Sequence, residues 1–286
     1  MNSNIVLRFS CADQPGIVAE VAGFFADLGF NIEESTQFED RQTGRFFMRT
    51  EFCADRTQEL SLSDLNQRFA PLGDKYSMTW DIQPQDYKPR VVIAVSQWGH
   101  CLNGLLDGWK QGTLPIDIVA VVSNHQVMRD LTEWYGVPFH YLPITKETKP
   151  QQEEQILQVM NDCQADLLVL ARYMQILSDD MCRRLEGRAI NIHHSFLPGF
   201  KGAKPYHQAH DRGVKLIGAS AHYVTADLDE GPLIEQDVQR VSHANSPQEL
   251  VEIGRDTENL VLRRAVKWHA EQRVLLNGDK TVVFKR

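Results

Sequence analysis

The hydrophobic positions in the N-terminal part of the chain predict four short strands and two helices. Residues 5–9 form an apolar run typical of a strand, and Ile17, Val21, Phe24 and Leu28 recur at the spacing of one helix face. The same patterns predict further strands at 31–38, 45–52 and 76–82 and a helix around 60–69. This order, βαββαβ, is typical of a ferredoxin-like fold.

The ends of the first predicted helix carry residues that commonly start and stop helices. We expect Asp13 to cap its N-terminus and Pro15 to lie in its first turn, because both residues suit those positions. Gly29 is expected to follow its last turn, since glycine readily adopts a left-handed backbone.

A polar segment with two prolines, residues 83–90, separates this pattern from a different one. Directly after it, residues 91–95 form an apolar run typical of a strand that is buried on both faces. We therefore predict two domains, residues 1–86 and 87–286.

The second part of the chain alternates apolar runs with stretches of helical character. Such alternation predicts a Rossmann-like, mostly parallel α/β domain. Ser246, Pro247 and Glu249 match a capping box and predict the start of a long final helix. Besides 91–95, the predicted strands are residues 116–122, 167–170, 189–192, 216–224 and 233–241.

Composition narrows the classes of protein that this chain can belong to. Of its 286 residues, 42% are hydrophobic and 24% are charged, and its formal net charge is −8. These values exclude a collagen-like or largely disordered chain, and the acidic balance disfavours nucleic acid as a partner. No apolar run approaches the roughly 20 residues of a membrane span, so we expect no membrane partner. The first four residues do not resemble a signal peptide, and five scattered cysteines without a CxxC pair fit a reducing, cytoplasmic location.

Three polar residues are candidates for one catalytic site. Asn191 and His193 lie two apart at the end of a predicted strand, so their side chains point to the same side. This strand end is the edge of the sheet where open α/β folds place their sites. Asp229 follows in a polar loop between two later predicted strands. An amide donor, an imidazole and a carboxylate together suit acyl transfer without a covalent nucleophile.

The histidines of the second domain do not have the spacing of a metal site. His193 and His194 are adjacent, and His207 and His210 are three apart, whereas the helical zinc pair is four apart. We therefore expect no metal site. His222 lies in a predicted strand, and we expect its side chain to face the core.

The motif around the candidate residues resembles the folate-dependent formyltransferases. It consists of Asn191, Ile192, His193, Ser195, Leu197 and Pro198. The resemblance implies 10-formyltetrahydrofolate as the substrate, no further cofactor, and Asn191, His193 and Asp229 as the catalytic residues. It also implies that a wall around 170–177 and the loop 225–229 hold the pterin ring. The implied folate-binding residues are Leu170, Tyr173, Met174, Gln175, Ile176, Leu177, Thr225, Ala226, Asp227 and Leu228.

The sequence departs from the transferases of this family in two places. Where those enzymes carry a glycine-rich loop for the acceptor's phosphate, residues 97–101 read Gln-Trp-Gly-His-Cys. The run 200–208 is the second departure. Both segments resemble the corresponding segments of the formyltetrahydrofolate deformylases. That resemblance implies hydrolysis to formate and tetrahydrofolate, with Trp98, Lys204 and His207 lining the pocket. Lys201, Lys204 and Arg212 either attract the glutamate tail of the folate or are solvated loop residues.

The N-terminal part resembles the ACT domains, on the residues Asp13, Gly16 and Asn31. ACT domains pair with one another and often bind amino acids. The resemblance implies a homodimer or homotetramer, and it places an effector at these three residues, with glycine or methionine as candidates. A purely architectural role for the domain is the alternative.

Two other functions remain open from the sequence. The chain could transfer the formyl group to an amine, or it could be a catalytically silent folate or amino-acid sensor. The altered loop at 97–101 disfavours transfer, and the retained Asn191, His193 and Asp229 disfavour the sensor.

Overall fold

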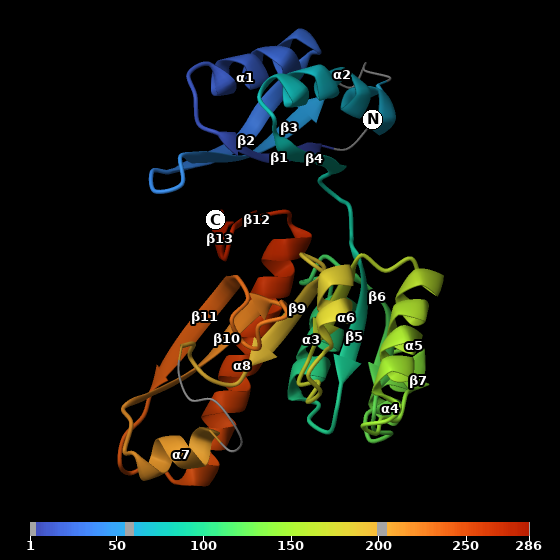
Figure 1. Ribbon diagram of the computed structural model, residues 1–286, viewed down its shortest axis with the longest axis vertical. Helices are drawn as coiled ribbons and strands as arrows, with labels where there is room; N and C mark the ends of the chain where they lie inside the picture. The colour runs from blue at the N-terminus through green and yellow to red at the C-terminus, as the bar shows by residue number, and fades with distance from the viewer. Residues whose placement is uncertain (1–3, 55–59, 199–204, 286) are drawn as a thin grey trace. The chain divides into compact units, whose positions relative to one another are not determined.

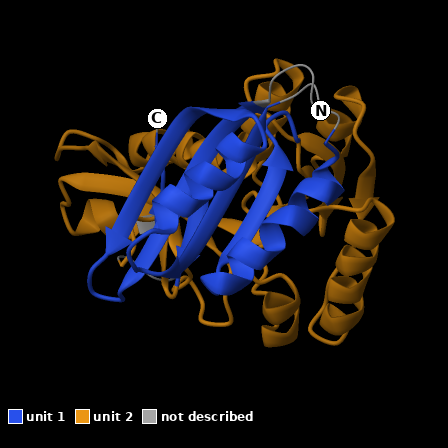
Figure 2. Ribbon diagram, turned by 90° about the horizontal axis from the view of Figure 1, so that it is seen from above, with its two compact units in different colours: residues 1–87, 271–277, 282–286 blue, residues 88–270, 278–281 orange. Residues whose placement is uncertain are grey.

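Two units make up the computed structural model, which describes residues 4–54, 60–198 and 205–285 (Figures 1 and 2). Unit 1 consists of residues 1–87, 271–277 and 282–286, and unit 2 consists of residues 88–270 and 278–281. The first break in the chain falls inside the polar segment 83–90. The division differs from the sequence-based one at the C-terminus, where two stretches cluster with the N-terminal unit.

Unit 1 contains a four-stranded antiparallel sheet and two helices. Its sheet has the order β2-β3-β1-β4, and the elements follow each other as βαββαβ, which confirms the predicted ferredoxin-like fold. Two stacked rings, Phe25 and Phe52, lie in the core with centroids 3.9 Å apart. The bounds are β1 (Ile5–Ala12), α1 (Ile17–Asp27), β2 (Phe30–Asp40), β3 (Arg45–Ala54), α2 (Leu62–Lys75) and β4 (Thr79–Pro84).

Helix α1 starts differently from the prediction. Gly16 occupies the N-cap position with φ of 96°, and no side chain caps the helix. The prediction that Asp13 caps it is wrong, because the N-cap position lies three residues later, and Pro15 precedes the helix instead of lying in its first turn. The backbone N–H of Asp13 donates to Gly44 O (2.9 Å) in the turn before β3. Gly29 follows the C-cap residue Leu28 with φ of 76°, as predicted.

Unit 2 contains a seven-stranded sheet of order β11-β10-β9-β8-β5-β6-β7. The five strands from β9 to β7 are parallel to one another, whereas β10 runs antiparallel to β9 and β11. This confirms the predicted Rossmann-like, mostly parallel fold. The strands are β5 (Arg90–Val95), β6 (Asp117–Ser123), β7 (Phe139–Tyr141), β8 (Leu167–Leu170), β9 (Ala189–His193), β10 (Leu216–Tyr223) and β11 (Leu233–Arg240).

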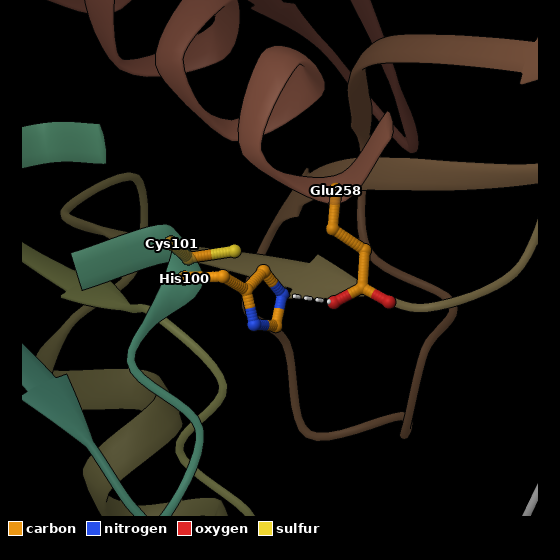
Figure 3. Close-up of side chains that lie close together, drawn as sticks. All are labelled: His100, Cys101 and Glu258. Carbon is orange, nitrogen blue, oxygen red and sulfur yellow. Dashed lines mark hydrogen bonds and ion pairs between the residues drawn. The ribbon is translucent and has the colours of Figure 1, made fainter. Parts of the chain in front are cut away.

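The helices of unit 2 connect and cover these strands. They are α3 (His100–Lys110), α4 (Arg129–Trp134), α5 (Lys149–Asp162), α6 (Asp179–Arg184), α7 (Pro205–Asp211) and α8 (Pro247–Ala270). The predicted capping box is present at the start of α8, where Ser246 N donates to Glu249 Oε2 (2.6 Å) and Glu249 N donates to Ser246 Oγ (3.3 Å). Helix α8 packs on α3, and His100 of α3 is hydrogen-bonded to Glu258 of α8 (Figure 3). Among the described helices, none combines the length and the apolarity needed to cross a bilayer.

The C-terminal segment covers the second face of the unit 1 sheet. Side chains alternate along β3, so Phe47, Arg49 and Glu51 share the face opposite to the helices. Phe47 forms an apolar cluster with Leu275 and Phe284, which lie in or beside the hairpin of β12 (Val274–Asn277) and β13 (Lys280–Val283). This contact gives the physical reason why the C-terminal residues cluster with unit 1.

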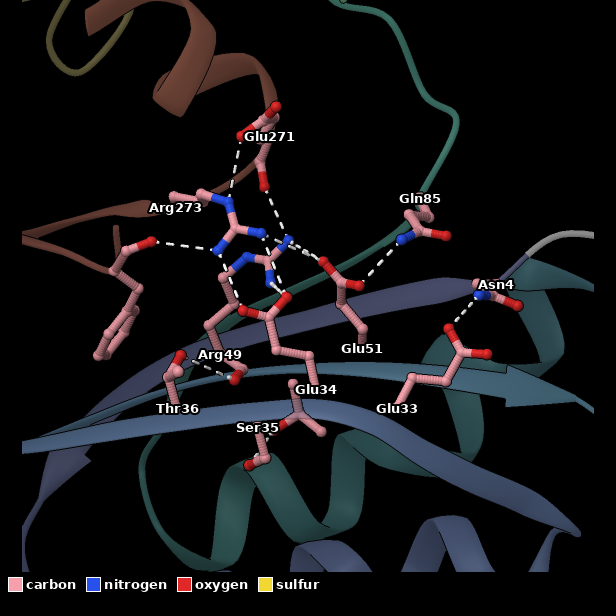
Figure 4. Close-up of polar contacts among 12 residues, drawn as sticks. Asn4, Glu33, Glu34, Ser35, Thr36, Arg49, Glu51, Gln85, Glu271 and Arg273 are labelled. Atoms are coloured by element: carbon pink, nitrogen blue, oxygen red, sulfur yellow. Dashed lines mark hydrogen bonds and ion pairs between the residues drawn. The ribbon is translucent and has the colours of Figure 1, made fainter. Parts of the chain in front are cut away.

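Two buried arginines connect this segment to the sheet (Figure 4). The side chains of Arg49 and Arg273 are each only 2% exposed. Arg49 Nη2 donates to Glu51 Oε1 (2.7 Å) and to Glu271 O (3.0 Å), and Arg273 Nη2 donates to Glu34 Oε2 (3.2 Å). Each cation thus has carboxylate partners, which a buried charge requires.

We expect the substitution Arg273→Ala to destabilise unit 1 by about 3–5 kcal/mol, because it removes one of the two buried cations that balance Glu34 and Glu51 and leaves only Arg49 of that pair. The thermal unfolding midpoint measures this loss. The matched control is Arg41→Ala, whose side chain is 88% exposed in an ion pair with Glu39. The control should change stability by about 1 kcal/mol or less. Equal midpoints for both variants would contradict a stabilising role of the buried network.

Candidate active site

A cavity of about 300 Å³ opens at the carboxyl ends of β8 and β9 in unit 2. Open α/β sheets commonly bind ligands at this edge. The residues that line it are Leu170, Arg172, Tyr173, Met174, Gln175, Ile176, Leu177, Cys182, Asn191, Ile192, His193, His194, His222, Val224, Thr225, Ala226, Asp227, Leu228 and Asp229. All three predicted catalytic residues and all ten predicted folate-binding residues therefore face one cavity.

Strand β9 positions Asn191 and His193. The two residues lie two apart on the strand, and both line the cavity. His193 is 6% exposed, and its Nε2 atom makes no hydrogen bond to any residue that the structure describes. A buried imidazole nitrogen that faces a cavity is available to a bound molecule.

Asp229 orients the His193 ring. Its Oδ1 atom lies 3.2 Å from His193 Nδ1, and the hydrogen bond from His193 lowers the pKa of the Asp229 carboxyl group. Asp229 adopts a left-handed backbone with φ of 58°, which is uncommon for residues other than glycine. The loop thus turns its carboxylate toward β9. With Nδ1 bound to a carboxylate, His193 presents Nε2 to the cavity.

His222 completes the polar set, and the sequence analysis did not assign it to the site. It lies on β10 opposite Asn191, and its Nε2 accepts from Asn191 Nδ2 (3.2 Å). Its Nδ1 donates to Tyr223 O (2.8 Å), and burial lowers its pKa, so the ring is neutral and orients the Asn191 amide. The prediction that it lies in a strand holds. The sequence contained one signal for this role. Two polar residues, Ser220 and His222, alternate within an otherwise apolar run, which indicates a polar face on the strand.

The predicted folate wall combines anchored and exposed side chains. Tyr173 is anchored, since its hydroxyl accepts from Gln152 Nε2 (2.7 Å), and burial raises the pKa of Tyr173 to about 12. Met174 and Ile176 are 51% and 60% exposed, and Leu228 across the cavity is 54% exposed. Exposed apolar side chains at a cavity suit a flat aromatic ligand.

Two of the three residues predicted to line the pocket, Trp98 and His207, are not among its described lining residues. Trp98 is 46% exposed and carries the guanidinium of Arg255 over its ring at 4.8 Å. His207 is exposed on α7 and does not reach the cavity. Lys204 lies outside the described residues, as does Lys201.

The predicted effector residues lie in unit 1. Asp13 and Gly16 belong to the exposed turn between β1 and α1, and Asn31 is exposed at the start of β2. Gly16 has the positive φ that places its backbone at the start of α1.

A second polar cluster adjoins the cavity and was not predicted (Figure 3). Glu258 of α8 is 1% exposed and accepts from Tyr206 Oη (2.6 Å). It also pairs with His100 Nε2 (2.8 Å) and with Arg172 Nε (3.4 Å), and these contacts lower its pKa against the opposing effect of burial. Cys101 lies beside the cluster, and burial raises the pKa of its thiol. The cluster is thus a carboxylate that protein donors already surround, with a thiol that is protonated at neutral pH.

Comparisons with known proteins agree with this architecture. The sequence model of the ACT domain matches residues 5–69, and that of the formyl transferases matches residues 89–266. The formyltetrahydrofolate deformylase of Corynebacterium sp. (strain P-1) is 48% identical over 280 residues, covering 98% of each chain. This chain belongs to the formyltetrahydrofolate deformylase family.

Solved structures place the family among the formyltransferases. The crystal structure of the formyltetrahydrofolate deformylase from Burkholderia mallei ATCC 23344 has a TM-score of 0.95 at 51% identity, covering 99% of this chain and 100% of that one. The glycinamide ribonucleotide transformylase 1 of Symbiobacterium toebii has a TM-score of 0.65 at 26% identity, covering 71% of this chain and 97% of that one. The deformylase likeness thus includes unit 1 as well as unit 2.

We expect His194 to lower the stability of this deformylase family member in acid. Burial, with the nearby charges of Arg172 and His193, lowers the pKa of His194 from 6.5 to about 4, although Glu258 and Asp229 oppose this effect. Between these pH values the unfolded chain binds a proton that the folded chain does not, so stability falls as the pH falls.

The substitution His194→Gln should flatten the pH dependence of the unfolding midpoint between pH 6.5 and about 4. His210→Gln is the control, because the side chain of His210 is 39% exposed. Parallel curves for the wild type and His194→Gln would show that His194 is not the linked group.

Proposed function

We propose that this chain hydrolyses 10-formyltetrahydrofolate to formate and tetrahydrofolate. The observation that carries the proposal is the imidazole of His193, held by Asp229 at 3.2 Å, with its other nitrogen buried at the cavity beside Asn191. The likeness to named deformylases over nearly the whole chain supports water as the acceptor of the formyl group.

The residues of the cavity have the groups that this hydrolysis needs. Water adds to the formyl carbon while its proton passes to Asp229, either directly or through Nε2 of His193. The amide N–H of Asn191 and an N–H of His193 stabilise the oxyanion of the tetrahedral intermediate. The C–N10 bond then breaks, and His193 returns a proton to N10.

The same residues act without a metal or another cofactor in this proposal. Asp229 and His193 supply the proton transfer, and the nearest His, Cys and Glu cluster is occupied internally, since His100, Tyr206 and Arg172 all pair with Glu258. The folate binds with its pterin ring between the wall 170–177 and the loop 225–228.

The first test is to supply 10-formyltetrahydrofolate without any amine and to measure formate. We expect Asp229→Asn to lose about 10²–10⁴ in kcat, because the base and the orienting charge are both removed, while tetrahydrofolate still binds. Asp211→Asn is the control, since Asp211 forms an exposed pair with His210 and its side chain is 81% exposed.

Three results of this assay separate the possible functions. Enzymatic formate production that Asp229→Asn loses supports hydrolysis. Turnover only after an amine is added would instead indicate a transferase. Folate binding with no turnover under either condition would indicate a sensor.

The proposed reaction has a place in one-carbon metabolism. It balances tetrahydrofolate against its formyl derivative and supplies formate for purine synthesis, in the cytoplasm. We further propose that the chain forms a homodimer or homotetramer through unit 1, which the match to the ACT domain model supports.

The ACT unit is also proposed to bind glycine or methionine as an effector. We expect isothermal titration calorimetry of the full chain to detect binding of one of the two amino acids. Binding should be lost in the double variant Asp13→Ala/Asn31→Ala, which removes the polar side chains at the proposed site. The full chain is needed because residues 271–277 and 282–286 belong to unit 1. If neither amino acid produces heat on titration, the effector proposal is wrong, and the purely architectural role of the ACT unit is the one that is left.

A further inference from the structure

Arg172 occupies an unusual position in the cavity wall. It lies two residues after the end of β8 and adopts φ of 63°, a left-handed conformation that costs free energy for any residue other than glycine. Its carbonyl oxygen accepts from Ser96 N (3.3 Å), which ties it to the end of β5. Tertiary contacts, and not the local preference of the backbone, therefore keep Arg172 in this left-handed conformation.

The guanidinium of Arg172 is fixed but incompletely paired. Its side chain is 12% exposed, and Nε lies 3.4 Å from Glu258 Oε2, an ion pair that holds the charge in place. Nε and Nη1 are nevertheless buried without a hydrogen bond to any part of the chain that the structure describes. Because Arg172 lines the same cavity as Asn191 and His193, the N–H groups of Nη1 are available to a ligand there, while Nε faces Glu258.

The partners of Glu258 make this arrangement rigid. Tyr206 Oη donates to Glu258 Oε1 (2.6 Å), and His100 Nε2 pairs with Oε2 (2.8 Å). The carboxylate therefore has contacts on both oxygens and balances the charge of Arg172 from the side of α8. A planar cation held in this way is suited to bind a carboxylate or a related oxyanion.

We propose that Arg172 is a further catalytic residue, which binds the oxygen atom delivered by water and then the carboxylate of the formate product. This inference rests on the proposed hydrolysis. Asn191 and His193 hold the oxygen of the original formyl group, and Arg172 holds the second oxygen. As the C–N10 bond breaks, N10 takes the proton that His193 received from water. The carbon leaves with its two oxygens as formic acid, which releases the second proton of the water to solvent and stays bound to Arg172 as formate.

The same guanidinium discriminates between nucleophiles. A water oxygen has two lone pairs, so while one attacks the formyl carbon the other accepts a hydrogen bond from Arg172, which has only donors. The nitrogen of an amine has one lone pair, which the attack uses, so an attacking amine leaves the guanidinium without an acceptor. Arg172 thus favours water over an amine.

Arg172→Gln tests this role, together with the double variant Arg172→Gln/Glu258→Gln, in which the buried Glu258 carboxylate does not lose its guanidinium partner while it is still charged. We expect kcat for formate release to fall about 10²–10³-fold in both variants, as for loss of an oxyanion donor. Inhibition by added formate should weaken about tenfold to a hundredfold, the usual effect of losing a hydrogen bond to a charged group. Arg172→Lys keeps the positive charge but loses the planar guanidinium with its paired N–H donors. Its kcat and its inhibition by formate should lie between those of the wild type and those of Arg172→Gln.

Competition with hydroxylamine measures the choice of nucleophile. The share of formohydroxamate relative to formate should rise in Arg172→Gln and in the double variant, after subtraction of the reaction without enzyme. Tetrahydrofolate affinity should change less than kcat does, because tetrahydrofolate lacks the formyl group that Arg172 is proposed to act on and the ten predicted folate-binding residues are unaltered. Arg183→Gln is the matched control, since Arg183 lies on α6 with its side chain 68% exposed, and it should behave as the wild type.

The outcomes separate this inference from the proposed function. If the wild type releases no formate, the proposed function is wrong and the inference has no basis. If the wild type releases formate but all three Arg172 variants keep its kcat, its formate inhibition and its product ratio, only the role of Arg172 is overturned. A fall in kcat with unchanged formate inhibition and product ratio would show a purely structural role and would also overturn it.

Discussion

The contact between Asp229 and His193 determines the geometry of the whole site. It joins a loop that follows β10 to the end of β9, so two separate segments of the chain form one wall of the cavity. His222 Nε2 lies 3.8 Å from the same carboxylate oxygen, Asp229 Oδ1, and it orients the amide of Asn191. The lowered pKa of Asp229 keeps the carboxylate charged, and this charge is what holds the ring of His193 in one orientation. Every role proposed for the neighbouring residues depends on that ring.

The sequence predicted the parts of this site that depend on local periodicity. Asn191 and His193 share a side because side chains alternate along a strand, and the alternation of strands and helices placed them at the binding edge of a parallel sheet. The assignment of Asp229 came from the family resemblance, since no pattern in the sequence shows that a loop 36 positions after His193 returns to it. Spatial pairing of this kind depends on the register between β9 and β10.

The features that the sequence did not predict depend on contacts between distant segments. His222 was interpreted as a core residue because burial on an apolar strand gives no sign of the amide opposite to it. Arg172 lies within the predicted folate wall, but its partner Glu258 is on a helix 86 positions later. Asp13 is a good capping residue by type, yet its backbone is hydrogen-bonded to the turn beside β3, and the N-cap of helix α1 lies three residues later, at Gly16. In each case a tertiary contact outweighed a local preference.

The covering of the unit 1 sheet by the C-terminal segment has a consequence for biosynthesis. A ribosome completes residues 1–87 long before it reaches the segment that carries Arg273 and Phe284. Until then the nascent chain has the strands of unit 1 but not the groups that neutralise and cover Phe47, Arg49 and Glu51. Residues 1–87 are therefore synthesised well before the C-terminal residues that unit 1 needs to reach its final structure.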